Sequence, residues 1–127
     1  MNNFKNSQEF GKFGERLSAQ YLVKNGFRIV ETNYRCFEGE VDIIAEKEDL
    51  LIIVEVKSRQ KIDSDETLLS ITKSKQRKIS RATADFMEKN QQFSEHFIRF
   101  DIITVIKAPH YDEYVITHYD DAFCYLF

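Results

Sequence analysis

The stretch GEVDIIAEKEDLLIIVEVKSR, residues 39–59, decides the fold, because it joins two strongly apolar runs through a charged turn. Apolar runs of this length around a short polar turn are typical of a β-hairpin. We predict strands over residues 40–46 and 50–57. The second run is almost continuously apolar, which indicates a central strand covered on both faces. Charged side chains nevertheless interrupt both runs, namely Glu40, Asp42, Glu55 and Lys57.

The register of this hairpin decides whether the interrupting acids meet. Successive side chains on a strand alternate between its two faces, so charges two residues apart share a face. A turn centred on residues 47–48 places Glu40 opposite Glu55. Asp42 then lies opposite Ile53 and diagonal to Glu55, with the two Cα atoms about 7 Å apart. A slip of one residue would put the two acids on opposite faces of the sheet.

The paired acids favour a metal-binding site, because neighbouring carboxylates repel each other and burial makes their ionisation costlier. A hard divalent cation removes both penalties, and Mg²⁺ binds one or two protein carboxylates while keeping several waters. We therefore predict a Mg²⁺ or Mn²⁺ site formed by Asp42, Glu55 and the backbone carbonyl of Val56. Lys57, roughly 7 Å along the same face, would contact a scissile phosphate and orient or deprotonate the attacking water. The alternative is a simple salt bridge between Glu55 and Lys57, since E-x-K triplets are common by chance.

Helical periodicity predicts one helix before the hairpin and one after it. The first covers residues 7–25, with Ser7 as its N-cap and Asn25-Gly26 as its left-handed stop. Glu15 lies beside its apolar stripe among small residues, so we expect it to be half-buried against a closely packed element. The second covers residues 72–90 and has a core face formed by Ile79, Ala82, Thr83 and Phe86.

Further apolar runs predict strands over residues 27–33, 97–106 and 114–119, and residues 58–70 read as a loop. The resulting order α-β-β-β-α-β-β implies an α/β protein with a mixed central sheet flanked by helices. With 127 residues, of which 43% are hydrophobic, four glycines and one proline, the chain has the composition of one domain spanning residues 1–127.

Charge, cysteine content and hydropathy narrow the functional class. The formal net charge of −3 provides no general attraction to nucleic acid, so such binding requires a local basic patch. The two cysteines, Cys36 and Cys124, are too few for a disulfide framework and fit reduced thiols. No apolar signal segment begins the chain, and the run LLIIV is too short to cross a bilayer. We expect a cytoplasmic protein with no membrane partner.

Several motifs resemble the YraN family of small bacterial proteins, over residues 10–123. They are FGKFGERLSAQYLVKNGFRIVETNYRC, GEVDIIA, IIVEVKSR, KSKQRKISRATADFM, RFDIITV and a final DAF. That family is similar to the PD-(D/E)xK nuclease superfamily, which includes archaeal Holliday-junction resolvases and tRNA-splicing endonuclease domains. The resemblance implies a restriction-endonuclease-like fold.

The same resemblance implies roles for individual positions. Asp42 matches the first aspartate of the motif, and Val41 stands before it where the usual pair has proline. Glu55 and Lys57 match the second acid and the lysine. On the first helix, Glu15 matches a glutamate that helps form the metal or water site in resolvase-like relatives. A recurring polar position on the following helix completes the implied catalytic set: Glu15, Asp42, Glu55, Lys57 and Gln76.

Basic residues gather at the start of the second helix. Residues 73–81 contain five cations and no acid, and three of the cations lie four residues apart on one helix face. Beside a carboxylate cleft such a stripe would contact phosphates, whereas alone it is more often a solvated face. Tyr34 and Phe37 would either stack on nucleic acid or pack over the sheet edge. We predict nucleic-acid contacts at Arg35, Arg59, Lys73, Lys75, Arg77 and Arg81.

The histidines and one further aspartate show no catalytic pattern. His96, His110 and His118 lack zinc-ligand spacing, and we expect them on the surface or in loops. Asp101 opens an apolar strand, where we expect it to pair with a lysine or arginine from a neighbouring element.

Together these features predict a metal-dependent endonuclease that hydrolyses phosphodiester bonds in structured or branched DNA, with Mg²⁺ or Mn²⁺ as cofactor. The alternative is a non-catalytic nucleic-acid-binding module that retains the nuclease fold. Resolvase relatives also keep open a homodimer in which a second subunit completes the site. The first hypothesis requires cleavage that Asp42→Asn abolishes, and the alternative requires salt-dependent binding that is indifferent to this change.

Overall fold

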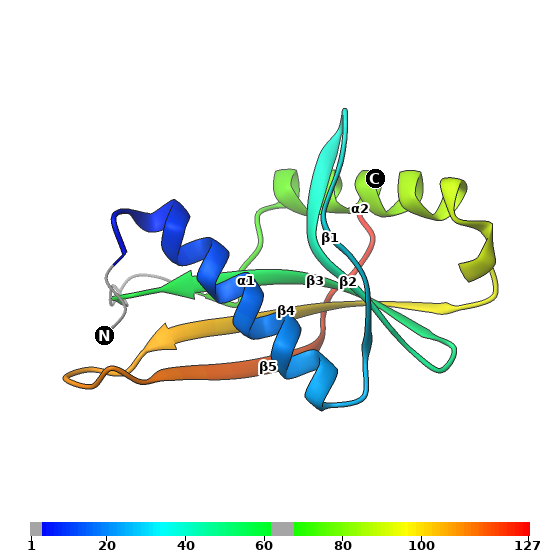
Figure 1. The fold of residues 1–127 in the computed structure, drawn as a ribbon. Helices are drawn as coiled ribbons and strands as arrows, with labels where there is room; N and C mark the ends of the chain where they lie inside the picture. Colours follow the sequence, from blue (N-terminus) through cyan, green and yellow to red (C-terminus); the bar gives the residue numbers. More distant parts are fainter. Residues whose placement is uncertain (1–3, 62–67) are drawn as a thin grey trace.

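The computed structural model describes residues 4–61 and 68–127, whose path is drawn in Figure 1. Helices and strands follow in the predicted order, with a short 3₁₀-helix, η1, that the sequence pattern did not reveal. Of the predicted loop 58–70, residues 58–59 belong to a strand and residues 62–67 lie outside the described part. The elements are α1 (Ser7–Lys24), β1 (Arg28–Cys36), β2 (Gly39–Lys47), β3 (Leu50–Arg59), α2 (Lys73–Lys89), η1 (Gln91–Phe93), β4 (Phe97–Lys107) and β5 (Tyr114–Phe123).

The strands of the described residues form one mixed sheet in the order β1-β2-β3-β4-β5. β3 and β4 run parallel, and the other neighbouring pairs run antiparallel. Residues 51–55 of β3 are buried in succession, which confirms the predicted central strand covered on both faces. The element order and the flanking helices confirm the predicted α/β fold, and they agree with a restriction-endonuclease-like architecture.

α1 and α2 cover opposite faces of this sheet, and each closes its own hydrophobic core (Figure 1). Side chains alternate along β3, so that Ile52 packs with α1 and Ile53 packs with α2. In the described part of the chain, no helix is long and apolar enough to span a membrane. The core face predicted for the second helix is confirmed, because four of its residues are buried: Ile79, Ala82, Thr83 and Phe86.

α1 begins at Ser7, where the pattern predicts it, but its N-cap lies one residue earlier than predicted. Oδ1 of Asn6 accepts a hydrogen bond from the backbone N–H of Glu9 at 2.9 Å, so Asn6 is the N-cap. The prediction of Ser7 is wrong because the extended backbone that a cap requires occurs at Asn6. Further along, α1 approaches β3 so closely that a Cβ atom on Gly14 would lie 1.8 Å from Oγ of Ser58. Small residues on α1 therefore allow the close packing that we expected.

β1 extends beyond its predicted end, to Cys36, so Tyr34 belongs to a strand and not to a loop. The ring of Tyr34 packs on Phe86 of α2 with centroids 5.3 Å apart, and its hydroxyl donates a hydrogen bond to Asp85. These contacts favour the packing alternative for Tyr34. Phe37, by contrast, is fully exposed in the turn between β1 and β2.

The turn between β2 and β3 lies one residue later than predicted. Ile43 pairs with Val54, and this register leaves Glu48-Asp49 as the turn. The predicted register is therefore wrong by two residues. Continued by one pair, the observed register places Asp42 across from Glu55 and not diagonal to it. A shift of two residues keeps every side chain on its own face, which is why the alternation in the sequence fits both registers.

Candidate functional site

Asp42 lies where β2 separates from β3. The pairing of these strands ends at Ile43 and Val54, and beyond this point the β1–β2 hairpin bends away from the rest of the sheet (Figure 1). Oδ2 of Asp42 accepts a hydrogen bond from the backbone N–H of Val56 at 2.8 Å. The carboxylate thus satisfies a strand N–H at the place where the partner strand departs. We call this place the strand opening.

Glu55 of β3 lies at the same strand opening, with its side chain only 7% exposed. Burial raises the pKa of Asp42 to about 8, and the negative charge of Glu55 adds to this shift. The hydrogen bond from the N–H of Val56 acts in the opposite direction. The two acids therefore lie close enough to repel each other, as an arrangement around one cation requires.

α1 brings a third acid toward the strand opening. This acid is Glu15, which lines a cleft together with Asn33 of β1. Burial raises the pKa of Glu15, and the charges of Glu40 and Glu55 act in the same direction. Glu15 is half-buried as expected, because its neighbour Gly14 lets α1 pack directly on β3.

Lys75 of α2 partly neutralises these acids. Its Nζ lies 2.6 Å from Oε1 of Glu55. Burial lowers the pKa of Lys75, but the hydrogen bond and the charge of Glu55 outweigh this and raise it above its usual value. We predicted Lys75 only as one phosphate contact among several. Its position four residues before the buried Ile79, on the sheet-facing side of α2, is the signal that would have placed it at the acids.

Two other predicted catalytic residues contact backbone carbonyls. Nζ of Lys57 donates to the carbonyl oxygen of Ser70 at 2.6 Å, just before α2. Nε2 of Gln76 donates to the carbonyl oxygen of Cys124 at 3.0 Å, which ties α2 to the C-terminal segment. The predicted residues that the structure brings together at the strand opening are Asp42, Glu55, Val56 and Glu15.

The predicted nucleic-acid contacts lie on several elements. Arg35 pairs with Glu40 at 3.0 Å, and Arg81 approaches Glu38 at 3.8 Å. The guanidinium of Arg59 donates to the carbonyl oxygen of the preceding residue at 2.8 Å. The remaining members of the predicted set lie on α2. Lys73 and Lys75 are exposed, and Arg77 is half-buried.

Two clefts lie beside residues of this site, one beside Glu15 and one beside Lys75. A cleft of about 540 Å³ between α1 and β1 is lined by Glu15 and by the cations Lys12, Arg16 and Arg35. A smaller cleft of about 300 Å³ lies beside Lys75 on α2. No sequence pattern revealed this group of cations, because the acidic Glu15 lies between Lys12 and Arg16 on α1 and Arg35 comes from β1.

The oxygen donors at the strand opening fit a hard divalent cation. Within residues 4–61 and 68–127, no three His, Cys, Asp or Glu side chains form a group that holds a metal ion by themselves. A site here would therefore combine the carboxylates of Asp42 and Glu55 with the backbone carbonyl of Val56 and with water. Mg²⁺ and Mn²⁺ accept this mixture, whereas structural Zn²⁺ prefers four nitrogen or sulfur ligands.

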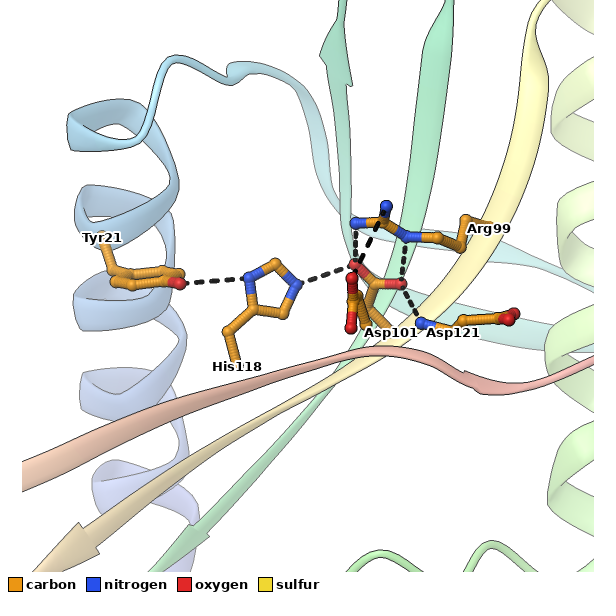
Figure 2. Close-up of polar contacts among 6 residues, drawn as sticks. Tyr21, Arg99, Asp101, His118 and Asp121 are labelled. Carbon is orange, nitrogen blue, oxygen red and sulfur yellow. Dashed lines mark hydrogen bonds and ion pairs between the residues drawn. The ribbon is translucent and has the colours of Figure 1, made fainter.

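Asp101 of β4 is held in a separate network, which Figure 2 shows. Nε and Nη2 of Arg99 donate to its two carboxylate oxygens, each at 2.9 Å. Nε2 of His118 lies 2.7 Å from Oδ2, and the backbone N–H of Asp121 donates to Oδ1 at 3.0 Å. Nδ1 of His118 in turn lies 3.2 Å from the hydroxyl of Tyr21 on α1. The partner arginine comes from the same strand and not from a neighbouring element, so that part of our prediction is wrong.

The prediction that the histidines lie on the surface or in loops is wrong for His118, which lies in β5 with a largely buried side chain. His96 lies in the loop between η1 and β4, as predicted, although its side chain is also largely buried. The side chain of His118 is 12% exposed, and that of His96 is 15% exposed. Nε2 of His96 lies 2.6 Å from Oε2 of Glu46. Each of these histidines meets an acid from a distant part of the chain, which no local spacing reveals. His110 is exposed, as predicted.

Comparisons with known proteins identify relatives of this chain. Residues 14–105 match the family described as "Uncharacterised protein family UPF0102". A UPF0102 protein of Flavobacterium psychrophilum is 42% identical over 115 residues, which cover 91% of this chain and 93% of the relative. A UPF0102 protein of Dictyoglomus turgidum is 41% identical over 104 residues, covering 82% and 87% of the two chains. A third, of Clostridium botulinum, is 34% identical over 117 residues, covering 92% and 95%. The matched segments include the strand opening, and the chain belongs to the UPF0102 (YraN) family.

Proposed function

We propose that the protein is a metal-dependent endonuclease that hydrolyses phosphodiester bonds in structured or branched DNA, with Mg²⁺ or Mn²⁺ as cofactor. The observation that carries this proposal is the pair of neighbouring acids at the strand opening, the buried Glu55 and the half-buried Asp42. Two acids that repel each other in a buried position do not favour folding, so such pairs are candidates for function.

The residues of the strand opening would have different roles in this reaction. Asp42, Glu55 and the backbone carbonyl of Val56 would hold the ion, which when bound polarises a phosphate oxygen and acidifies a bound water. Glu15 would accept a hydrogen bond or a proton from the attacking water, and its raised pKa suits that exchange. Lys57 would turn from the carbonyl of Ser70 to align the scissile phosphate.

Cations on both sides of the acids supply the contacts that a polyanion needs. Because the whole chain carries a net charge of −3, attraction to DNA is confined to these local groups and should weaken steeply as salt is added. Gln76 would act indirectly, by fixing α2 against the C-terminal segment. The proposed backbone contacts are Arg35, Arg59, Lys73, Lys75, Arg77 and Arg81, joined by Lys12 and Arg16 of the cleft on α1.

We place this activity in the cytoplasm, with DNA as the partner and no membrane contact. Cys36 and Cys124 are both free cysteines, in agreement with a reducing compartment. A homodimer that completes the site stays part of the proposal, and gel filtration with light scattering would detect it.

The test is cleavage of a labelled branched DNA by the full chain with Mg²⁺ or Mn²⁺. We expect metal-dependent cleavage that Asp42→Asn reduces by roughly a thousandfold or more, because the carboxylate that holds the ion is lost. Asp49→Asn is the matched control, since Asp49 lies exposed in the β2–β3 turn and should leave cleavage unchanged. Equal cleavage by wild type and Asp42→Asn would show that the reaction does not use the strand opening.

The ion pair between Lys75 and Glu55 favours one alternative, a nucleic-acid-binding module that has kept the nuclease fold. A lysine that permanently neutralises the acids would make a metal unnecessary. This alternative predicts binding to DNA that depends on salt and is indifferent to chelators and to Asp42→Asn. Fluorescence anisotropy with and without a chelator separates it from the nuclease.

A further inference from the structure

The ammonium of Lys75 lies against the buried carboxylate of Glu55 in the manner of a bound cation. Its Nζ is 2.6 Å from Oε1 of Glu55, and the side chain of Glu55 is 7% exposed. The side chain of Lys75 is itself 55% exposed, so it reaches from the surface of α2 to the carboxylate of a buried residue. A positive charge in this position lowers the repulsion between Glu55 and Asp42.

We propose that Lys75 is the resident counter-ion of this site, that a divalent cation competes with it for Glu55, and that the displaced ammonium then binds a substrate phosphate. This inference rests on the proposed metal site and goes beyond it by naming the group that the metal must displace. An ammonium and a divalent cation repel each other strongly at contact distance. Pairing of Lys75 with Glu55 and metal binding by Glu55 therefore exclude each other.

The local structure lets the ammonium move without the helix. Oγ1 of Thr72 caps α2 by accepting a hydrogen bond from the backbone N–H of Lys75 at 3.1 Å, which fixes the main chain. The side chain beyond it is long and flexible. A cleft of about 300 Å³ lies beside it and is lined by Thr72, Ser74 and Lys78 as well as Glu40.

This cleft is where the displaced ammonium would meet a phosphate. Two lysines and hydroxyl groups of α2 would share the phosphate oxygens there, with Lys75 as the group that metal binding releases. Because linked equilibria are reciprocal, the metal should raise the affinity for phosphate groups, and a bound phosphate should raise the affinity for the metal.

The test is calorimetric titration of Mn²⁺ into the wild-type chain and into Lys75→Met at about pH 8, well above the usual pKa of a carboxylic acid. We expect Lys75→Met to bind Mn²⁺ roughly tenfold more tightly, because the competing cation is gone. Lys78→Met is the matched control, since Lys78 lines the same cleft on the same helix but makes no ion pair with Glu55 in the described structure. It should bind Mn²⁺ like the wild type.

A second variant guards against a folding defect. Lys75→Gln removes the charge and keeps a polar side chain, and circular dichroism reports whether each variant is folded. Equal or weaker Mn²⁺ binding in both folded Lys75 variants would overturn the inference while leaving the metal site intact. Absence of Mn²⁺ binding in the wild type and every variant would overturn the inference and the metal site together. Tighter Mn²⁺ binding in a Lys75 variant, together with no cleavage of DNA by the wild type, would support the inference and contradict the proposed nuclease activity.

The phosphate step has its own readout. A labelled phosphorothioate oligonucleotide resists hydrolysis and reports binding by fluorescence anisotropy. We expect Mn²⁺ to tighten its binding to the wild type by roughly threefold to tenfold, and Lys75→Met to lose most of this gain. A gain of the same size in wild type and variant would overturn the release of Lys75 to phosphate.

Discussion

Two aspartates of the same sheet, Asp101 in β4 and Asp42 in β2, lie in opposite surroundings. Asp101 is fully buried and receives hydrogen bonds from Arg99, His118 and the backbone N–H of Asp121 (Figure 2). Burial works to raise the pKa of Asp101, but the bonds from His118 and Arg99 hold it below its usual value. This network satisfies a buried charge completely.

Asp42 receives a hydrogen bond from the N–H of Val56 and faces two acids, Glu55 and Glu15, with Lys75 as the nearby cation. Its pKa is raised to about 8, so neutral Asp42 is favoured over charged Asp42 near neutrality. Removing one partner from a hydrogen-bonded buried acid destabilises the fold, whereas an acid placed among like charges is a candidate for binding a ligand. The contrast therefore distinguishes a structural aspartate, Asp101, from the aspartate that we propose to be functional, Asp42.

The largest expected effect tests the structural aspartate. Asp101→Asn should lower the free energy of unfolding by about 3 kcal/mol at about pH 6, because it leaves the Arg99 guanidinium without its buried partner. Equilibrium urea unfolding measures the change. Asp120→Asn is the control, since the side chain of Asp120 is 73% exposed and its carboxylate comes no nearer than 4.0 Å to the guanidinium of Arg99. A loss below about 1 kcal/mol for Asp101→Asn would mean that the network contributes little.

A smaller effect of opposite sign on the free energy of unfolding should follow at Asp42. The pKa of Asp42 rises from 3.8 to about 8 on folding, so the folded chain binds this proton more tightly. The stability contributed by protonated Asp42 is present below about pH 4 and is lost as the pH rises toward 8. Asp42→Asn cannot ionise, and at about pH 8 it should raise the free energy of unfolding by on the order of 2 kcal/mol.

Urea unfolding at about pH 5 and about pH 8 checks the sign of this effect. The free energy of unfolding should differ less between the two pH values in Asp42→Asn than in the wild type. Asp49→Asn should keep the wild-type difference in this free energy, because Asp49 lies exposed in a turn. If Asp42→Asn proved less stable than the wild type at both values, Asp42 would be a structural residue like Asp101.

The smallest expected effect concerns the outer end of the Asp101 network. Tyr21→Phe removes the hydroxyl that lies 3.2 Å from Nδ1 of His118 and should cost about 0.5–1 kcal/mol of stability. Mn²⁺ binding measured by calorimetry should stay unchanged, because Tyr21 contacts the other network. A clear change in Mn²⁺ affinity would show that the two regions are coupled through α1.

Some features of the site follow from short-range pattern. Asp42 and Glu55 interrupt apolar runs on either side of a charged turn, so a hairpin that brings them together could be predicted from the sequence, with their shared face depending on its register. The core face of α2 follows from 3.6-residue periodicity in the same way. The resemblance to the YraN family added Glu15, which the helix pattern identified only as a half-buried acid.

Other features depend on contacts between distant segments. The exact register of β2 on β3 escaped prediction, because two registers that differ by two residues bury the same side chains. The pairs Lys75–Glu55, His118–Asp101 and His96–Glu46 join residues that are between 17 and 50 positions apart, so neither partner has a local signature.

By itself, the sequence determined which side chains face inward on each helix and strand, because that depends on backbone periods of 3.6 and 2 residues. Tertiary structure alone decided which charges meet across elements. It placed a lysine on one buried acid and an arginine with a histidine on another, and these partnerships depend on the packing of the whole sheet and its two covering helices.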